Sequence, residues 1–140
     1  MAEIILSNRM QALTDMVTPG TVITDVGCDH GFVSVYLVQK GISPRVIAMD
    51  VRSGPLEHAR EHIREYGLED RIETRLSDGL HSLKTGEAAG MICAGMGGPL
   101  MEKILTEGRE QAKGFRELIL QPQSEIPHFR TFLMDEGYLL

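Results

Sequence analysis

Asp25-Val26-Gly27-Cys28-Asp29-His30-Gly31 is the stretch that decides the fold, because it places a glycine-rich turn directly after the apolar run 22–24. A strand, such a turn and a helix form the first unit of a doubly wound α/β sheet, where the turn contacts the cofactor. A turn that binds a pyrophosphate presents N–H groups to an anion, which two carboxylates would repel. Asp25 and Asp29 therefore favour a cationic ligand. S-adenosylmethionine fits, since it carries an ammonium and a sulfonium but no phosphate.

Short apolar runs alternate with helical patterns along the rest of the chain. The pattern predicts an opening helix capped by Ser7, strands at 22–25, 45–50, 72–76, 88–93 and 117–120, and helices at 30–40, 55–66, 99–107 and 125–136. This alternation is typical of a Rossmann-like α/β fold, with a mostly parallel sheet and helices on both faces. The helix at 30–40 is apolar almost all round, so we expect it to be sandwiched between other elements.

The segment 138–140 resembles the start of a sixth strand. We therefore expect the last strands of a larger sheet to be missing from residues 1–140. In that case the strand at 117–120 has a free edge, which is prone to pairing with other chains.

Composition points to one soluble domain, since 42% of the 140 residues are hydrophobic and 24% are charged. No apolar run approaches the roughly 20 residues needed to cross a bilayer, and the first residues lack a signal-peptide pattern. We expect a cytoplasmic protein without a membrane partner. Its two cysteines, Cys28 and Cys93, are expected to be reduced, and no metal is expected.

The net charge of −6 and the pI near 5.3 count against a nucleic-acid substrate, because such partners usually meet a basic face. Six arginines nevertheless fall in one central stretch and could gather on the surface: Arg45, Arg52, Arg60, Arg64, Arg71 and Arg75. On helices, most arginines are simply solvated.

Functional groups in an open α/β sheet gather beyond the carboxyl ends of the strands. Asp50 ends the second strand, at a spacing from the first turn at which an acid binds both ribose hydroxyls of a nucleoside. Asp78 follows the third strand and could accept the amine of an adenine, and Gly79 beside it could adopt a positive φ. Taken singly, Asp50 could be a solvent-facing strand end, and Asp78-Gly79 is almost as well explained as an ordinary Asp-Gly turn.

Two further segments follow the fourth and fifth strands. Gly95-Met96-Gly97-Gly98 precedes a helix and permits close approach of the backbone to a ligand, although a flexible connector would look the same. Gln121-Pro122-Gln123 supplies amides that can read the edge of a base. Each signal is weak alone, but all five segments agree in position.

These segments, in this order, resemble the bacterial tRNA (adenine-22-N1)-methyltransferases of the TrmK type over nearly the whole chain. The motifs that carry the resemblance are Asp25-Val-Gly-Cys-Asp-His, Asp50-Val51, Gly54-Pro55, Ser77-Asp-Gly-Leu, Ala94-Gly-Met-Gly-Gly and Leu118-Ile-Leu-Gln-Pro122. Many such enzymes have glutamate at the position of Asp50, alanine or glycine at Gly31 and asparagine at Gln123.

The resemblance implies that S-adenosylmethionine is the cofactor and that the methyl group passes to N1 of an adenine in tRNA. The expected cofactor-binding residues are Asp25, Gly27, Cys28, Asp29, Asp50, Val51, Asp78, Gly79, Gly95 and Met96, and the expected substrate-binding residues are Gly97, Gly98, Gln121 and Pro122. Such enzymes carry a helical extension after this domain. Residues 1–140 would then be a catalytic domain whose contacts with tRNA lie partly in the extension.

The chemistry at N1 of adenine needs positioning more than a strong base, because this nitrogen already has an in-plane lone pair. The methylated base is a cation, so a carboxylate near it would stabilise the developing charge, and Asp29 is the candidate. His30 could orient Asp29 or take a proton, or could simply pack at the helix start. The target base would have to leave its stack to reach the pocket. Asn-Pro-Pro-Tyr, which is typical of methylation at the amino group of adenine, is absent.

Several other functions remain open. His58-Ala-Arg-Glu61-His62 matches an H-x-x-E-H zinc motif, and Cys28 next to His30 suggests a cysteine nucleophile. A nicotinamide-dependent reductase would need a middle glycine between Gly27 and Gly31, and the sequence has none. The chain could also methylate another substrate, or bind the cofactor without catalysis.

Overall fold

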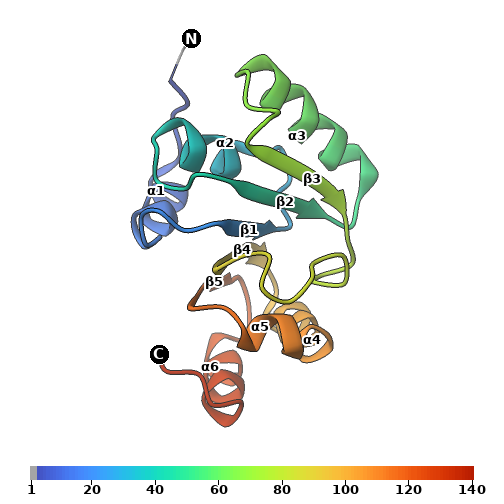
Figure 1. The fold of residues 1–140 in the computed structure, drawn as a ribbon. Coiled ribbons are helices and arrows are strands. Elements are labelled where there is room, and N and C mark those ends of the chain that lie inside the picture. The colour runs from blue at the N-terminus through green and yellow to red at the C-terminus, as the bar shows by residue number, and fades with distance from the viewer. Residues whose placement is uncertain (1–2) are drawn as a thin grey trace.

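The computed structural model describes residues 3–140 as a five-stranded parallel sheet covered by helices on both faces (Figure 1). The strands are β1 (Ile23–Val26), β2 (Val46–Asp50), β3 (Ile72–Leu76), β4 (Gly90–Met96) and β5 (Glu117–Pro122). Their order is β3-β2-β1-β4-β5, so β2 and β3 lie on one side of β1, and β4 and β5 lie on the other. The carboxyl ends of β1 and β4 therefore flank the topological switch point, where doubly wound sheets bind their ligands.

Helices α1 (Asn8–Asp15), α2 (Phe32–Gln39) and α3 (Ser53–Glu65) cover one face of the sheet. Helices α4 (Gly98–Glu107), α5 (Arg109–Lys113) and α6 (Ile126–Asp135) cover the other (Figure 1). Each face has its own core, and the two cores centre on α2 with α3 and on α4 with α6. Strands β1 and β2 are buried throughout, and their polar residues Thr24, Asp25 and Asp50 are buried with them. The predicted doubly wound fold is confirmed.

Helix α2 packs against the sheet between α1 and α3, as predicted, but it begins at Phe32 rather than at residue 30. The helix begins later because Asp29 and Gly31 have φ of 52° and 80°, and a right-handed helix needs negative φ. The turn after β1 is therefore longer than the pattern indicated. His30 lies in the turn rather than in the first turn of the helix.

Strands β4 and β5 extend further than predicted, through Met96 and Pro122 respectively. The two strands stay paired past an irregularity in register between Ala94 and Met96, where Gly95 has φ of 80°. A bulge of this kind re-aims the side chains that follow it. Gly95, Met96, Gln121 and Pro122 were expected in loops, and this expectation was wrong.

Two smaller differences lie in the C-terminal half. The short helix α5 follows α4 after Gly108, where the pattern predicted no helix. Residues 138–140 form no strand, and Tyr138 instead packs on the core beneath α4 and α6, with the Lys113 Nζ 4.0 Å from its ring centroid. Strand β5 lies at an edge of the sheet in residues 3–140, as the sequence predicted.

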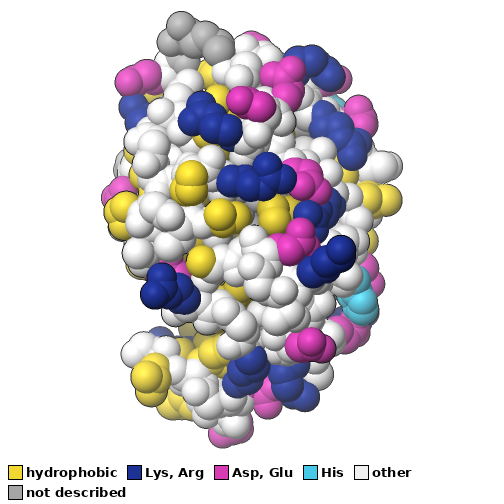
Figure 2. All heavy atoms as spheres, in the orientation of Figure 1, with side chains coloured by type: hydrophobic (Ala, Val, Ile, Leu, Met, Phe, Trp, Pro, Cys, Tyr) yellow, Lys and Arg dark blue, Asp and Glu magenta, His cyan; other side chains and the backbone are white. Residues whose placement is uncertain are grey.

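Charged side chains of both signs are interspersed on the face of the molecule shown in Figure 2. The central arginines do not form a separate basic patch, because acidic neighbours hold several of them. Arg45 pairs with Glu73 at 2.6 Å, and Arg75 pairs with Glu73 at 2.5 Å and with Glu87 at 2.6 Å. None of the helices described for residues 3–140 combines the length and the apolar character needed to cross a membrane.

Candidate active site

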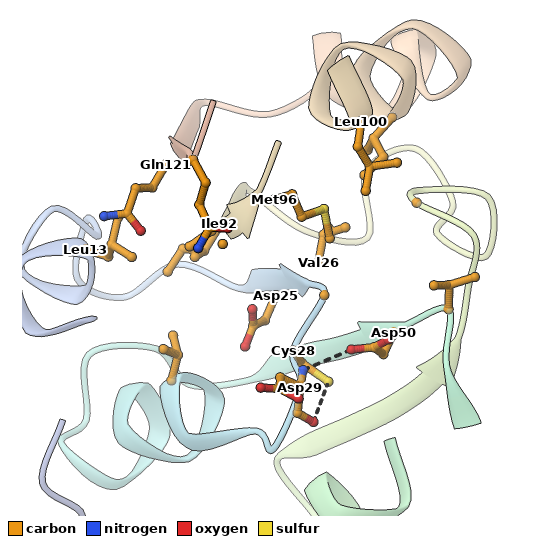
Figure 3. Close-up of a pocket in the computed structure, with 18 of the residues that line it drawn as sticks. Leu13, Asp25, Val26, Cys28, Asp29, Asp50, Ile92, Met96, Leu100 and Gln121 are labelled. Atoms are coloured by element: carbon orange, nitrogen blue, oxygen red, sulfur yellow. Dashed lines mark hydrogen bonds between the residues drawn. The ribbon is translucent and has the colours of Figure 1, made fainter. Parts of the chain in front are cut away.

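A cavity of about 640 Å³ opens at the carboxyl ends of the strands, where the topology places the switch point (Figure 3). Residues from all five strand ends, from α1 and from α4 line it. Those predicted from the sequence are Asp25, Gly27, Cys28, Asp29, Asp50, Val51, Asp78, Gly79, Gly95, Met96, Gly97 and Gln121. The fold therefore brings together twelve of the residues singled out on the linear chain.

The first turn is fixed to the neighbouring strand by its backbone. The N–H groups of Gly27 and Cys28 both donate to the carbonyl oxygen of Met49, at 2.8 and 2.9 Å. Gly27 has φ of 76°, and a Cβ atom there would lie 2.4 Å from the Met96 Cε. Gly27 thus lets the turn and the end of β4 approach each other across the cavity.

Asp50 is almost fully buried at the end of β2, and its two carboxylate oxygens hold two backbone segments. Oδ2 accepts a hydrogen bond from the Asp29 N–H at 3.0 Å, and Oδ1 accepts one from the Arg52 N–H at 2.9 Å. The Arg52 Nε is a third, longer donor to Oδ1 at 3.4 Å, so a ligand that takes both remaining bonds of the carboxylate would displace this side-chain contact. Asp50 both shapes the turn and faces the cavity (Figure 3).

Asp25 is buried in the central strand β1 and accepts a hydrogen bond from the Ser34 hydroxyl at 2.8 Å. Burial raises the pKa of Asp25 from 3.8 to about 6; the Ser34 hydrogen bond opposes this shift, and the negative charges of Asp50 and Asp29 add to it. A carboxylate that is costly to ionise beside two others is a feature of functional sites. A cation in the cavity would relieve this cost.

We expect Asp25 to make the protein less stable as the pH rises from about 4 to about 6. The pKa in the folded state lies above the unfolded value of 3.8, so the contribution is complete below 3.8 and is lost above about 6. The expected loss is about 3 kcal/mol in the free energy of unfolding. Urea unfolding of wild type and Asp25→Asn at about pH 3 and pH 7 measures it, because asparagine cannot ionise but can accept from Ser34. Identical pH dependence of the two proteins would contradict this assignment.

His30, Gly98 and Pro122 are predicted site residues that do not line the cavity. The His30 ring lies 5.2 Å from that of His58 and 6.0 Å from that of Phe32, and its Nε2 is 3.9 Å from the Asp29 Oδ1. That distance allows an ion pair when His30 is protonated but no direct hydrogen bond.

Gly98 is the first residue of α4, and it packs closely against the backbone of Ser124. Its N–H donates to the Ser124 carbonyl oxygen at 3.2 Å, and a Cβ atom would lie 2.6 Å from the same oxygen. The backbone after β5 therefore needs glycine at this position. This contact explains the second glycine of Gly97-Gly98 without a ligand.

The Gly98→Ala variant is expected to lose about 2 kcal/mol of stability, since the added methyl group meets a backbone atom that cannot rotate away. Gly54→Ala is the matched control: Gly54 is in the first turn of α3, with no atom within 4 Å of a Cβ. This control should gain up to about 1 kcal/mol. Urea unfolding of both variants provides the comparison, and equal effects would show that Gly98 is not constrained by Ser124.

Six lining residues outside the five predicted segments come from helices: Arg9, Met10 and Leu13 from α1, Val33 from α2, and Leu100 and Ile104 from α4. Their apolar spacing predicted a buried helix face but carried no sign that this face closes a cavity. On β5, the Gln121 Oε1 is buried without a hydrogen-bond partner in residues 3–140. A buried acceptor at the cavity wall is suited to a donor on a ligand.

The two cysteines are free and buried, one on each side of the central strands. Burial raises the pKa of the Cys28 thiol far above its ordinary value and that of Cys93 to about 12. Nucleophilic cysteines need the opposite shift, because the thiolate is the reactive form. The cysteine nucleophile considered from the sequence is therefore disfavoured.

The H-x-x-E-H residues of α3 lie outside the cavity. His62 stacks on Phe32 with ring centroids 4.5 Å apart, and its Nδ1 is 2.8 Å from the His30 carbonyl oxygen. Within residues 3–140, the group with metal-ligand spacing is instead the exposed trio Asp78, His81 and Glu107. The His81 Nε2 lies 3.0 Å from the Glu107 Oε1, so a hydrogen bond between the loop after β3 and α4 accounts for the closeness of these two residues.

This chain is similar to known proteins in both sequence and fold. The methyltransferase domain family matches residues 6–140. The tRNA (adenine(22)-N(1))-methyltransferase of Bacillus subtilis is 36% identical over 140 residues, which cover 100% of this chain and 59% of that protein.

Solved structures agree. The crystal structure of the Bacillus subtilis enzyme TrmK has a TM-score of 0.94 over 99% of this chain and 59% of that one, at 36% identity. The Streptococcus pneumoniae protein Sp1610 in complex with S-adenosyl-L-methionine has a TM-score of 0.91 at 34% identity, over 95% of this chain and 63% of that one. The chain thus spans about three fifths of these relatives. The resemblance inferred from the motifs is confirmed, and the chain belongs to the methyltransferase domain family.

Proposed function

We propose that this protein transfers the methyl group of S-adenosylmethionine to N1 of an adenine in tRNA, at the position numbered 22. The observation that carries the proposal is the cavity at the switch point, which four carboxylates line: Asp25, Asp29, Asp50 and Asp78. An acidic cavity suits a cofactor with two positive groups and no phosphate. The similarity to the Bacillus subtilis enzyme over the whole chain supports the choice of substrate.

The cavity walls suggest where the cofactor lies. Asp50 would accept from both ribose hydroxyls, with Val51 beside it, and Asp78 would accept from the adenine amine. Gly27, Cys28 and Asp29 would pass beneath the methionyl part, while Gly79, Gly95 and Met96 would close the opposite wall. The Streptococcus pneumoniae relative was solved with S-adenosyl-L-methionine, which supports this cofactor.

The target adenine would enter beside Gly97 and Gln121. The unpartnered Gln121 Oε1 would accept from the exocyclic amine of the base, which aims N1 at the methyl group. Gly98 and Pro122 would support this wall through the backbone. The adenine must leave its stack in the RNA to reach the cavity.

The reaction is a displacement at the methyl carbon. The N1 lone pair of adenine forms the new N–C bond while the S–C pair returns to sulfur, giving S-adenosylhomocysteine and a cationic N1-methyladenine. Asp29 would stabilise the charge that develops on the ring. His30, whose Nε2 is 3.9 Å from the Asp29 Oδ1, would orient that carboxylate.

We also infer that residues 1–140 act as the catalytic domain of a cytoplasmic protein. Its relatives are longer, and the formal net charge of residues 1–140 is −6. Segments beyond these residues would then add positive charge for the RNA.

Two measurements test the proposed function. Calorimetric titration with S-adenosylmethionine should show binding, and titration with NAD should not. Incubation with an unmodified tRNA transcript should then give N1-methyladenine by mass spectrometry, and the same transcript with guanine at position 22 should not. Binding without methylation of either RNA would favour another substrate or a cofactor-binding module. No binding of S-adenosylmethionine would overturn the proposal.

A further inference from the structure

Four ring side chains meet on the surface next to the first turn, and we call them the ring cluster: His30, Phe32, His58 and His62. The Phe32 ring is nearly parallel to those of His30 and His62, at 26° and 29°, with centroids 6.0 and 4.5 Å apart. The His30 ring meets His58 edge-on, with centroids 5.2 Å apart. His62 is half-buried and the other three are exposed. The cluster is therefore ordered by its own contacts and open to solvent.

The fold assembles this cluster through a close approach of the first turn to α3. Gly31 has φ of 80°, and a Cβ atom there would lie 3.0 Å from the Ala59 Cβ. A side chain at Gly31 would hold the turn away from the helix segment that carries His58 and His62. The His62 Nδ1 also lies 2.8 Å from the His30 carbonyl oxygen, so the ring donates to the turn. Ligand binding to the cluster then costs little ordering of side chains.

The ring cluster begins one residue from the cavity. Asp29 lines the cavity, and its Oδ1 is 3.9 Å from the His30 Nε2 and 3.9 Å from the Arg52 guanidinium. Asp29 is the carboxylate proposed to meet the target adenine. The nucleotides on both sides of that adenine are each joined to it by one phosphodiester. When the adenine leaves its stack, the faces of neighbouring bases are uncovered beside the cavity.

The charges around the ring cluster favour a base over a phosphate. Asp29 is 58% exposed, and the exposed acid Glu61 lies one helical turn after His58 on α3. The nearby guanidinium of Arg52 already approaches the carboxylates of Asp29 and Asp50. A phosphate would be repelled by these acids, whereas a base is neutral. Phenylalanine and histidine rings both stack on bases, and imidazole nitrogens can also bond to base edges.

We propose that the ring cluster stacks an unpaired base of the RNA substrate, outside the cavity that receives the target adenine. The inference rests on the proposed function. Stacking there would replace contacts that the RNA loses when the adenine is extruded. It would strengthen binding of the RNA without touching the cofactor. The histidines of the H-x-x-E-H motif would then serve as rings rather than as metal ligands.

Binding of an unmodified tRNA transcript to ring variants tests the proposal. We expect Phe32→Leu and His58→Ala each to bind the transcript about tenfold more weakly than wild type, the effect of one lost stacking contact. His58→Phe keeps a ring that neither ionises nor binds metal, and it should bind as wild type does. His128→Ala removes an exposed histidine of α6 and is the matched control, with no expected change.

Two further measurements separate stacking from damage to the fold or the active site. Affinity for S-adenosylmethionine, thermal unfolding and the single-turnover rate at saturating tRNA should match wild type in Phe32→Leu and His58→Ala. Transcripts with one abasic nucleotide, placed in turn at each position around the target adenine, identify the stacked base. At one position the wild type should bind about tenfold more weakly, and Phe32→Leu should cause no further loss.

Other outcomes overturn the inference in distinct ways. If His58→Phe bound tRNA as weakly as His58→Ala, the imidazole would act through charge, hydrogen bonding or a metal rather than through stacking. If the losses from Phe32→Leu and from the abasic site added at every position, the ring would contact no base. Normal tRNA binding by both ring variants would remove the cluster from the RNA interface and leave the proposed function intact. A wild-type protein that methylated no tRNA would overturn the proposed function, and the inference with it.

Discussion

The Asp50→Ala variant is expected to bind S-adenosylmethionine about 100-fold more weakly than wild type. The buried carboxylate would accept from two ribose hydroxyls, and hydrogen bonds to a charged group are worth about 1.5–3 kcal/mol each. Loss of both amounts to roughly 3 kcal/mol, or a factor of about 100 in Kd. The same carboxylate holds the N–H groups of Asp29 and Arg52, so the turn also loses its anchor.

Calorimetric titration measures the effect, with thermal unfolding as a check on the fold. Asp50→Glu keeps the charge on a longer side chain and should retain most of the affinity. Asp70→Ala removes an exposed carboxylate that does not line the cavity and should leave binding unchanged. An Asp50→Ala protein with wild-type affinity would remove Asp50 from the ribose site.

The Asp29→Asn variant is expected to lower the rate of methyl transfer about 100-fold while changing the affinity for S-adenosylmethionine by less than about threefold. Asp29 lines the cavity with φ of 52°, and its side chain is 58% exposed, so it can face a substrate base. Preorganised groups that meet developing charge typically contribute a factor of 10² to 10³. Asparagine tolerates the same left-handed backbone, so this change removes the charge and little else.

Single-turnover transfer to unmodified tRNA, with the cofactor saturating, separates chemistry from binding. Asp15→Asn, at an exposed acid of α1 outside the cavity, is the control and should react at the wild-type rate. A normal rate for Asp29→Asn would exclude Asp29 from catalysis. A fall in cofactor affinity as large as the fall in rate would make Asp29 a cofactor-binding residue only.

The elements of the sheet were predictable because their signals are local. Each strand contains a short apolar or alternating run, and the helical segments carry apolar residues bounded by glycine or proline. The errors occurred where a partner decides the outcome. β4 continues through Gly95 because β5 lies beside it, and residues 138–140 form no strand while Tyr138 packs on the core.

The candidate site was predictable to the extent that chain topology places it. Asp25 and Asp50 lie at the carboxyl ends of β1 and β2, Asp78 follows β3, and parallel strands end at the same edge of the sheet. His30 was singled out for its neighbours in sequence, yet the positive φ of Gly31 turns the chain, and its ring packs against His58 and Phe32.

The sequence by itself determined the order of strands and helices, the acidic character of the first turn and the identity of the carboxylates at the strand ends. These properties depend on residues that are neighbours along the chain. Only the tertiary structure decided that Arg9 of α1 lines the cavity, that the Gln121 Oε1 is buried without a hydrogen-bond partner in residues 3–140, and that a Cβ atom at Gly98 would collide with the Ser124 carbonyl oxygen. Each of these depends on the approach of segments far apart in sequence, which packing sets and no local pattern encodes.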